Sequence, residues 1–69
     1  MIHGRVIRAT FPDGKTALYV VAEQDAAAAE MLLATSLEVE AELEQVGLAS
    51  PKLLKAMALS PGEFKRTDE

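Results

Sequence analysis

The stretch Thr16-Ala17-Leu18-Tyr19-Val20-Val21-Ala22 is the densest run of β-branched and aromatic residues in the sequence, and it decides the fold. Residues of these types favour a pleated, half-buried strand. Residues 2–11 form a second such run, and Pro12-Asp13-Gly14 between the two is a strong turn signal. Residues 2–23 are therefore predicted to form a β-hairpin on which every later apolar segment packs.

Two registers of this hairpin compete. A three-residue loop with Gly14 in a left-handed conformation pairs Phe11 with Lys15 and spreads bulky apolar residues over both faces. A four-residue loop pairs Phe11 with Thr16 and gathers them on one face. We favour the four-residue loop because register usually follows the face that must be buried. Its inner face carries Ile7, Ala9, Phe11, Leu18, Val20 and Ala22, and its outer face Val6, Arg8, Thr10, Ala17, Tyr19, Val21 and Glu23.

Length and composition limit the class of protein. A chain of 69 residues makes a single domain, residues 1–69. It has no cysteine and one histidine, which excludes disulfides, thiolate zinc sites and His-rich metal sites. No apolar run approaches the roughly 20 residues that span a bilayer, and the N-terminus lacks the pattern of a signal peptide. We therefore expect a cytoplasmic protein that does not bind membranes.

Two helices are predicted from their caps. Asp25 is a good N-cap, and the Ala-, Leu- and Met-rich residues 26–34 follow it, with Ala29, Leu32 and Leu33 as an apolar stripe that Ala28 widens. Ser50-Pro51 starts a second helix over residues 51–59. Its expected buried side is Leu53, Leu54, Met57 and Ala58, and its expected exposed side is Lys52 and Lys55.

Residues 37–46 have two readings. Leu37, Val39, Ala41 and Leu43 alternate with Glu38, Glu40, Glu42 and Glu44, which is the period of a strand with one apolar and one acidic face. A helix would use Val39, Leu43 and Val46 as its stripe, but it would scatter the glutamates around its circumference. We favour the strand, with Gly47 breaking the pattern, and the helix remains the alternative.

These elements make a small α+β domain of order ββαβα. The third strand is predicted to lie beside the first and antiparallel to it, which gives sheet order 2-1-3 with the two helices packed on the sheet. This order sets Arg8 among the glutamates of the third strand. Phe64 is the last apolar anchor, and residues 65–69 are predicted to form a disordered tail.

Charge is segregated along the chain. Residues 23–44 carry seven acids and no base, whereas residues 1–22 have a net charge of +2. The whole chain has a net charge of −4, with its basic residues scattered. Phosphate binding needs a clustered basic field, so nucleic acid is an unlikely partner. It remains the alternative function, through the basic hairpin residues Arg5, Arg8 and Lys15 with Tyr19.

The candidate reactive groups have simple structural readings. The row of Glu38, Glu40, Glu42 and Glu44 is too widely spaced for a compact calcium cage, and we read it as a solvated face. His3 and Glu23 make an acid–base pair only if they meet across the hairpin, and we read His3 as a surface residue. We therefore predict no enzyme activity, no catalytic or metal-binding residues and no cofactor.

The outer face of the hairpin is the remaining candidate surface. The residues assigned to it are Val6, Arg8, Ala17, Tyr19 and Val21. It is less polar than a solvated sheet face, and apolar patches of this kind mark association surfaces. The alternative is that the second helix or the tail with Phe64 covers it. The sequence thus favours a small non-enzymatic protein-interaction module, either a homodimer or a domain that binds another protein.

Overall fold

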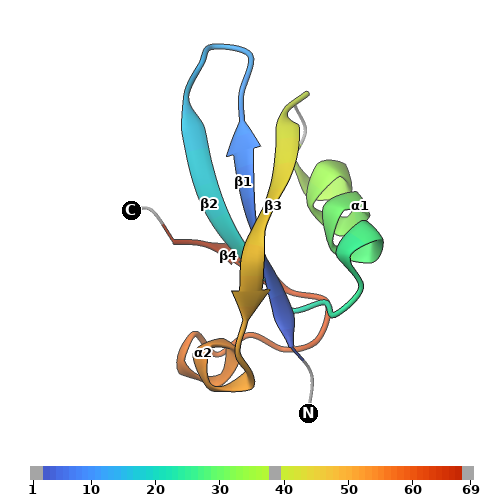
Figure 1. Cartoon of the computed structure of the whole chain (residues 1–69), viewed down its shortest axis with the longest axis vertical. Helices are drawn as coiled ribbons and strands as arrows, with labels where there is room; N and C mark the ends of the chain where they lie inside the picture. Colours follow the sequence, from blue (N-terminus) through green and yellow to red (C-terminus); the bar gives the residue numbers. More distant parts are fainter. Residues whose placement is uncertain (1–2, 38–39, 68–69) are drawn as a thin grey trace.

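The computed structural model describes residues 3–37 and 40–67 and contains four strands and two helices (Figure 1). All strand pairs are antiparallel, and the sheet order is β3-β1-β2-β4. No helix of the described residues is long and apolar enough to cross a membrane. The elements in chain order are β1 Gly4–Thr10, β2 Thr16–Val21, α1 Ala26–Ser36, β3 Glu42–Ala49, α2 Pro51–Ala56 and β4 Phe64–Arg66.

The predicted α+β class is confirmed, but the predicted strand count is wrong. β3 lies beside β1 and antiparallel to it, as expected, and β4 adds a fourth strand on the other side of β2. The tail predicted over residues 65–69 instead has Lys65 and Arg66 in β4, and the Thr67 N–H donates to the Leu18 carbonyl at 2.8 Å. Residues 68 and 69 lie outside the described part. A strand of three residues has no periodic pattern from which it can be predicted.

The favoured hairpin register is wrong, and the three-residue loop is the one that forms. Phe11 pairs with Lys15: its N–H donates to the Lys15 carbonyl at 2.8 Å, and its carbonyl accepts from Gly14 at 2.9 Å. Gly14 has φ +87°, and the Lys15 N–H donates to the Asp13 carboxylate at 3.0 Å. Local turn chemistry therefore outweighed the preference for gathering apolar side chains on one face.

The observed register turns the side chains of β2 to the opposite face. Ile7 lies opposite Tyr19 and Ala9 opposite Ala17, so these residues share a face with Val21. The predicted inner face is therefore wrong for Leu18, Val20 and Ala22. The face that is formed packs on α1 in the larger core cluster, whose buried members are Ile7, Ala9, Ala17, Tyr19, Val21, Ala29 and Leu33.

Helix α1 begins where its cap predicts. The Asp25 carboxylate accepts from the N–H groups of Ala27 at 2.8 Å and Ala28 at 3.1 Å. The helix runs two residues beyond its predicted end, to Ser36, whose hydroxyl donates to the Leu32 carbonyl at 2.9 Å. Within the predicted stripe Ala29 and Leu33 are buried, whereas Ala28 is exposed. One turn of the helix therefore anchors it on the sheet.

Helix α2 packs on the other face of the sheet. The Ser50 hydroxyl caps it by accepting from the Leu53 N–H at 3.1 Å, as predicted. The helix ends at Ala56, earlier than predicted, and Ala58 takes a left-handed φ of 55°. Leu54 is buried, but Leu53 and Ala58, predicted to be buried, are exposed. The smaller core cluster here has as buried members Val20, Ala22, Ala49 and Leu54, with Val6, Met57 and Leu59 packed against it.

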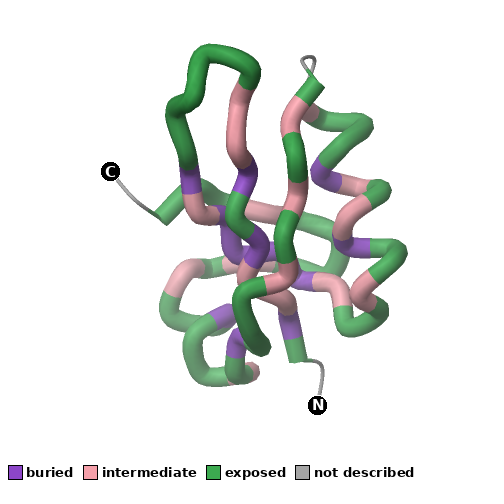
Figure 2. The backbone as a smooth tube through the Cα atoms, turned by 45° about the horizontal axis from the view of Figure 1, so that its top comes forward, coloured by how far each residue is buried: buried purple, intermediate pink, exposed green. Residues whose placement is uncertain are grey.

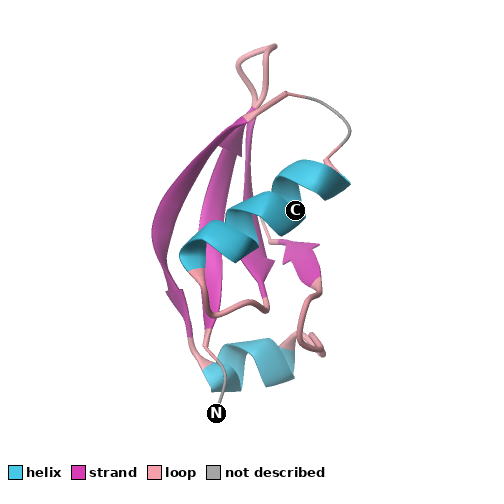
Figure 3. Cartoon of the chain, turned by 90° about the vertical axis from the view of Figure 1, so that its right-hand side faces the viewer, coloured by secondary structure: helices cyan, strands magenta, loops and turns pink. Residues whose placement is uncertain are grey.

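The two helices therefore lie on opposite sides of the sheet rather than on one side. In Figure 3, α1 lies across one face and α2 sits at the end of the sheet near the N-terminus. In Figure 2 the buried residues gather in the middle and lower parts of the strands, and the hairpin tip is exposed. Both faces of the hairpin are thus covered over part of their length by the chain itself.

The predicted strand in residues 37–46 is confirmed in type but displaced along the chain. Strand β3 starts at Glu42 and continues through Gly47 to Ala49. Its register with β1 shifts between Val6, which faces Gly47, and Ile7, which faces Gln45. Val46 is therefore an extra residue, the mark of a β-bulge. The bulge lets Ala49 reach the α2 face, where it is buried.

Gly4 tests how closely β1 packs against the backbone of β2 and against α2. A Cβ atom at Gly4 would lie 2.4 Å from the Val21 carbonyl oxygen and 2.9 Å from a Leu54 methyl carbon. We expect Gly4→Ala to lower the free energy of unfolding by about 1–3 kcal/mol through overpacking. Urea denaturation measures this change.

Gly47→Ala is the matched control, because a Cβ atom there would have no atom of the described residues within 4 Å. We expect its free energy of unfolding to stay within about 0.5 kcal/mol of the parent. An equal loss in both variants would contradict the account of Gly4.

Candidate functional site

The five residues of the predicted partner surface do not share one face. Ala17, Tyr19 and Val21 are buried between the sheet and α1, and the Tyr19 ring meets Phe64 edge-on at a centroid distance of 5.8 Å. Val6 and Arg8 lie on the opposite face, where Val6 packs beside α2. The apolar side chains of this predicted surface are thus covered by elements of the same chain.

The basic hairpin residues are separated as well. Arg8 forms an ion pair with Glu44 of β3, as the predicted strand order implied. The Arg5 side chain donates to the Gln24 carbonyl at 2.9 Å, and Lys15 is exposed at the hairpin tip. Tyr19, predicted to lie with them, is buried. These groups do not form the continuous basic field with an exposed ring that a nucleic-acid strand needs.

His3 and Glu23 occupy the open end of the hairpin. His3 is exposed, and the Glu23 carboxylate accepts from the Asp25 N–H at 3.2 Å just before α1 begins. Among residues 3–37 and 40–67, no group of three His, Cys, Asp or Glu side chains is arranged to hold a metal ion. Glu23 therefore has a local structural partner at the start of the helix.

The acidic row is only partly a strand face. Glu42 and Glu44 belong to β3 and are exposed, Glu40 is exposed just before the strand, and Glu38 lies outside the described residues. Glu42 lies opposite Thr10 and Glu44 opposite Arg8, so both side chains are on the α2 face of the sheet.

Strand β3 is the feature that stands out as a surface. It is an edge strand, because the sheet order leaves its second side unpaired within the described residues. Val46 is 53% exposed and Leu48 63% exposed, and Leu53 of α2, which follows directly, is 40% exposed. Figure 1 shows β3 at the front of the molecule, running down to α2. An edge strand with exposed apolar side chains is a template for pairing with another chain.

The hairpin bond fixes which backbone groups of β3 face outward. Because Phe11 bonds to β2, the backbone groups of Thr10 and Arg8 point the other way, toward β3. Their partners Glu42 and Glu44 point back toward β1. Leu43, which lies between them, and Gln45, which follows Glu44, present their N–H and C=O groups to the free edge.

The bulge shifts this alternation by one residue. Beyond it, Gly47 faces Val6 and Ala49 faces Gly4, so both direct their backbone groups toward β1. Leu48 then presents its groups to the free edge. The outward positions of β3 are therefore 43, 45 and 48.

Gln45 holds β3 against α1 behind this edge. Its side-chain amide donates to the Glu30 carboxylate at 2.8 Å and to the Ala26 carbonyl at 3.3 Å. The other amide atom, Oε1, is buried and has no hydrogen-bond partner among the described residues. The strand with the free edge is thus held by β1 beside it and by α1 on one face.

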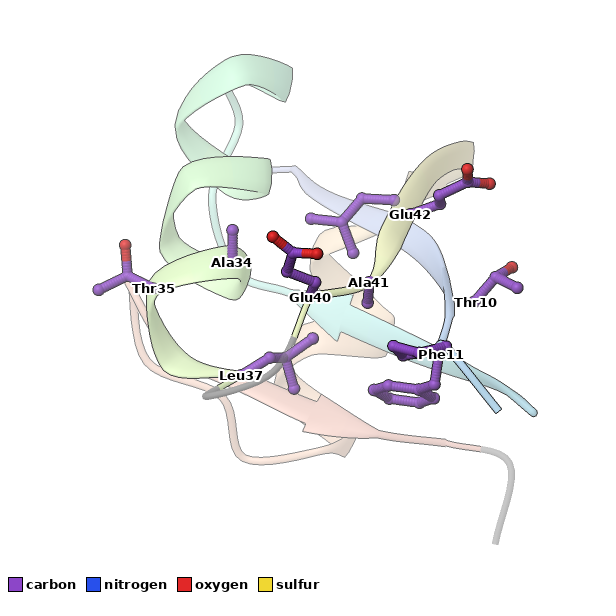
Figure 4. A pocket seen from close by; sticks show the side chains of 10 residues that line it. Thr10, Phe11, Ala34, Thr35, Leu37, Glu40, Ala41 and Glu42 are labelled. Atoms are coloured by element: carbon purple, nitrogen blue, oxygen red, sulfur yellow. The ribbon is translucent and has the colours of Figure 1, made fainter. Parts of the chain in front are cut away.

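A groove lies at the far end of the same strand. Its volume is about 890 Å³, and Figure 4 shows Phe11, Leu37 and Ala41 reaching it from three segments. Glu40 and Glu42 supply charges along it. Two of its lining residues, Leu37 and Glu40, are separated in the sequence by residues 38 and 39, which lie outside the described part of the chain, and we place no ligand site here.

Comparison with family models, curated proteins and solved structures finds no match for this chain. The geometry and chemistry of its own residues are therefore the basis for assigning a function.

The sequence pattern does not show this edge for an identifiable reason. The strand predicted in residues 37–46 stops before Gly47, so it does not include Leu48. The sequence contains one usable signal. With Leu43, Val46 and Leu48, this segment has more large apolar side chains than a strand with one buried face requires. The bulge itself leaves no mark in the sequence beyond Gly47.

Gln45 and Glu44 are neighbours on opposite faces and allow a direct comparison. We expect Gln45→Ala to cost about 1–2 kcal/mol of unfolding free energy, because the partly buried Glu30 carboxylate and Ala26 carbonyl lose their donor. Glu44→Ala removes an ion pair whose side chains are 50% and 62% exposed, so we expect a loss of at most about 1 kcal/mol. Chemical denaturation of both variants at low protein concentration measures the difference, and a larger loss in Glu44→Ala would contradict it.

Proposed function

We propose that this chain is a non-enzymatic protein-interaction module that binds through the free edge of β3. One observation carries the proposal: β3 is an edge strand of eight residues whose outer side pairs with none of the described residues, and on it Val46 and Leu48 are more than half exposed. A partner strand added to this edge would satisfy the outward backbone groups and cover these side chains. The hairpin contributes to this surface because its strand β1 pairs with the other side of β3.

The chemistry of the edge favours a specific partner over indiscriminate association. Glu42 and Glu44 flank its apolar centre on one side, and the bulge at Val46 interrupts the regular spacing of backbone groups. Charged residues and bulges on edge strands oppose pairing with arbitrary strands. A partner must therefore match both an irregular backbone and an acidic flank.

A photo-reactive side chain tests where the partner binds. We expect p-benzoylphenylalanine at position 48 to give discrete cross-linked products in cells that express the chain. The same group at position 31 should give none, because Met31 is 71% exposed on α1 and is not part of β3. Denaturing gels and mass spectrometry of the products measure this.

The edge substitution Val46→Lys supplies the control for chance cross-linking. It leaves the reactive group at position 48 in place, and we expect it to remove the products. Absence of products at position 48, or the same products from positions 48 and 31, would contradict the proposed function.

A further inference from the structure

We infer that the partner of the β3 edge is a second copy of this chain, paired antiparallel about a two-fold axis between Val46 and Gly47. The inference rests on the proposed function, because it names the partner of that same edge. Homodimers usually form by a two-fold contact in which one patch meets its own copy. The free edge of β3 can pair with the free edge of β3 in a second copy in this way.

The backbone selects the register. An antiparallel hydrogen-bonded pair needs outward groups on both strands. The outward positions on either side of the bulge are 45 and 48. Reversal about the bond between residues 46 and 47 places Gln45 opposite Leu48 of the second copy, and Leu48 opposite Gln45. The two bulges then meet at the axis instead of disrupting the pairing.

Charge disfavours two other two-fold registers that match backbone groups. Pairing Leu43 with Gln45 of the second copy puts Glu44 opposite Glu44, and pairing Leu43 with Leu43 puts Glu44 opposite Glu42. Like charges directly opposite each other destabilise a sheet. In the proposed register Glu44 lies opposite Ala49 instead. The two Glu44 residues are then five positions apart, about 17 Å along the strand, which exceeds the screening length of about 8 Å in physiological salt.

Side chains at the axis also complement each other. Val46 lies opposite Gly47 of the second copy, and a Cβ atom at Gly47 would have nothing within 4 Å in the described part of the single chain. The missing side chain therefore leaves space for the exposed Val46 of the other copy. Leu48 comes beside Gln45 on the face that α1 covers.

The flanks of the interface carry opposite charges. Glu42 falls opposite position 51 of the second copy, where its α2 begins. Glu42 and α2 lie on the same face of the sheet, and Lys52 and Lys55 of α2 are exposed. Each acidic flank thus meets the basic start of the other copy's helix. A joined sheet of this kind has eight strands, with the α1 helices of both copies on one face.

Sedimentation equilibrium of the purified chain over about 10 µM to 1 mM tests the inference, a range suited to a small interface. We expect the mean mass to rise from 7.4 kDa toward twice that value. Val46→Lys and Gly47→Lys should each raise the dissociation constant by about tenfold or more, because each places a cation at the axis. Met31→Lys, the same type of change at another exposed site, should leave it unchanged.

Charge reversal tests the register itself. Glu42→Lys and Lys52→Glu should each weaken association by about two- to fivefold, and the double variant should restore it. Amide hydrogen exchange adds a readout that does not depend on mutation. The Gln45 and Leu48 amides should become protected as the concentration rises. Circular dichroism of each variant verifies that the chain stays folded.

The possible failures are distinguishable. A chain that stays monomeric to 1 mM overturns the second copy as partner, whereas cross-links from position 48 to a different protein would leave the proposed function standing. Dimers that Val46→Lys and Gly47→Lys do not weaken would place the contact elsewhere and overturn the inference. Failure of the double charge reversal to restore binding would overturn the register.

Discussion

The hydrogen bond from the Phe11 N–H to the Lys15 carbonyl closes a three-residue turn, and the rest of the structure depends on it. The turn fixes which residues of β1 and β2 face each other, and therefore which side chains share a face. It places Tyr19 and Val21 under α1 and Val20 and Ala22 under α2. The same bond decides which backbone groups of β1 point toward β3, and through them which groups of β3 reach the free edge.

The parts of the fold that depend on local chemistry are predictable from the sequence. The hairpin follows from the flanking β-branched runs, and both helices begin at the caps Asp25 and Ser50. The position of β3 beside β1, with Arg8 paired to Glu44, also agrees with expectation. These features each arise from a few adjacent residues or from one topological rule.

The prediction of the hairpin register is wrong where local chain geometry competes with long-range packing. The register prediction assumed that one face had to hold all the large apolar side chains, whereas the chain buries both faces by placing one helix on each. That arrangement needs Leu54 and the late segment with Phe64 to reach back to the hairpin, contacts across more than thirty residues that no local pattern shows. The candidate edge was missed for a related reason, because the bulge at Val46 exists only relative to its partner strand β1.

The division of the core by the sheet has a consequence for how the molecule opens. Among the residues that the structure describes, the cluster around Val20 and Leu54 has four buried members, and the cluster around Ile7 and Leu33 has seven. Because they lie on opposite faces, release of α2 exposes the first cluster and leaves the second packed. Regions with fewer buried contacts open at a lower free energy than the whole molecule. We therefore expect α2 to detach at a lower free energy than the whole molecule unfolds, while the hairpin, α1 and most of β3 remain folded.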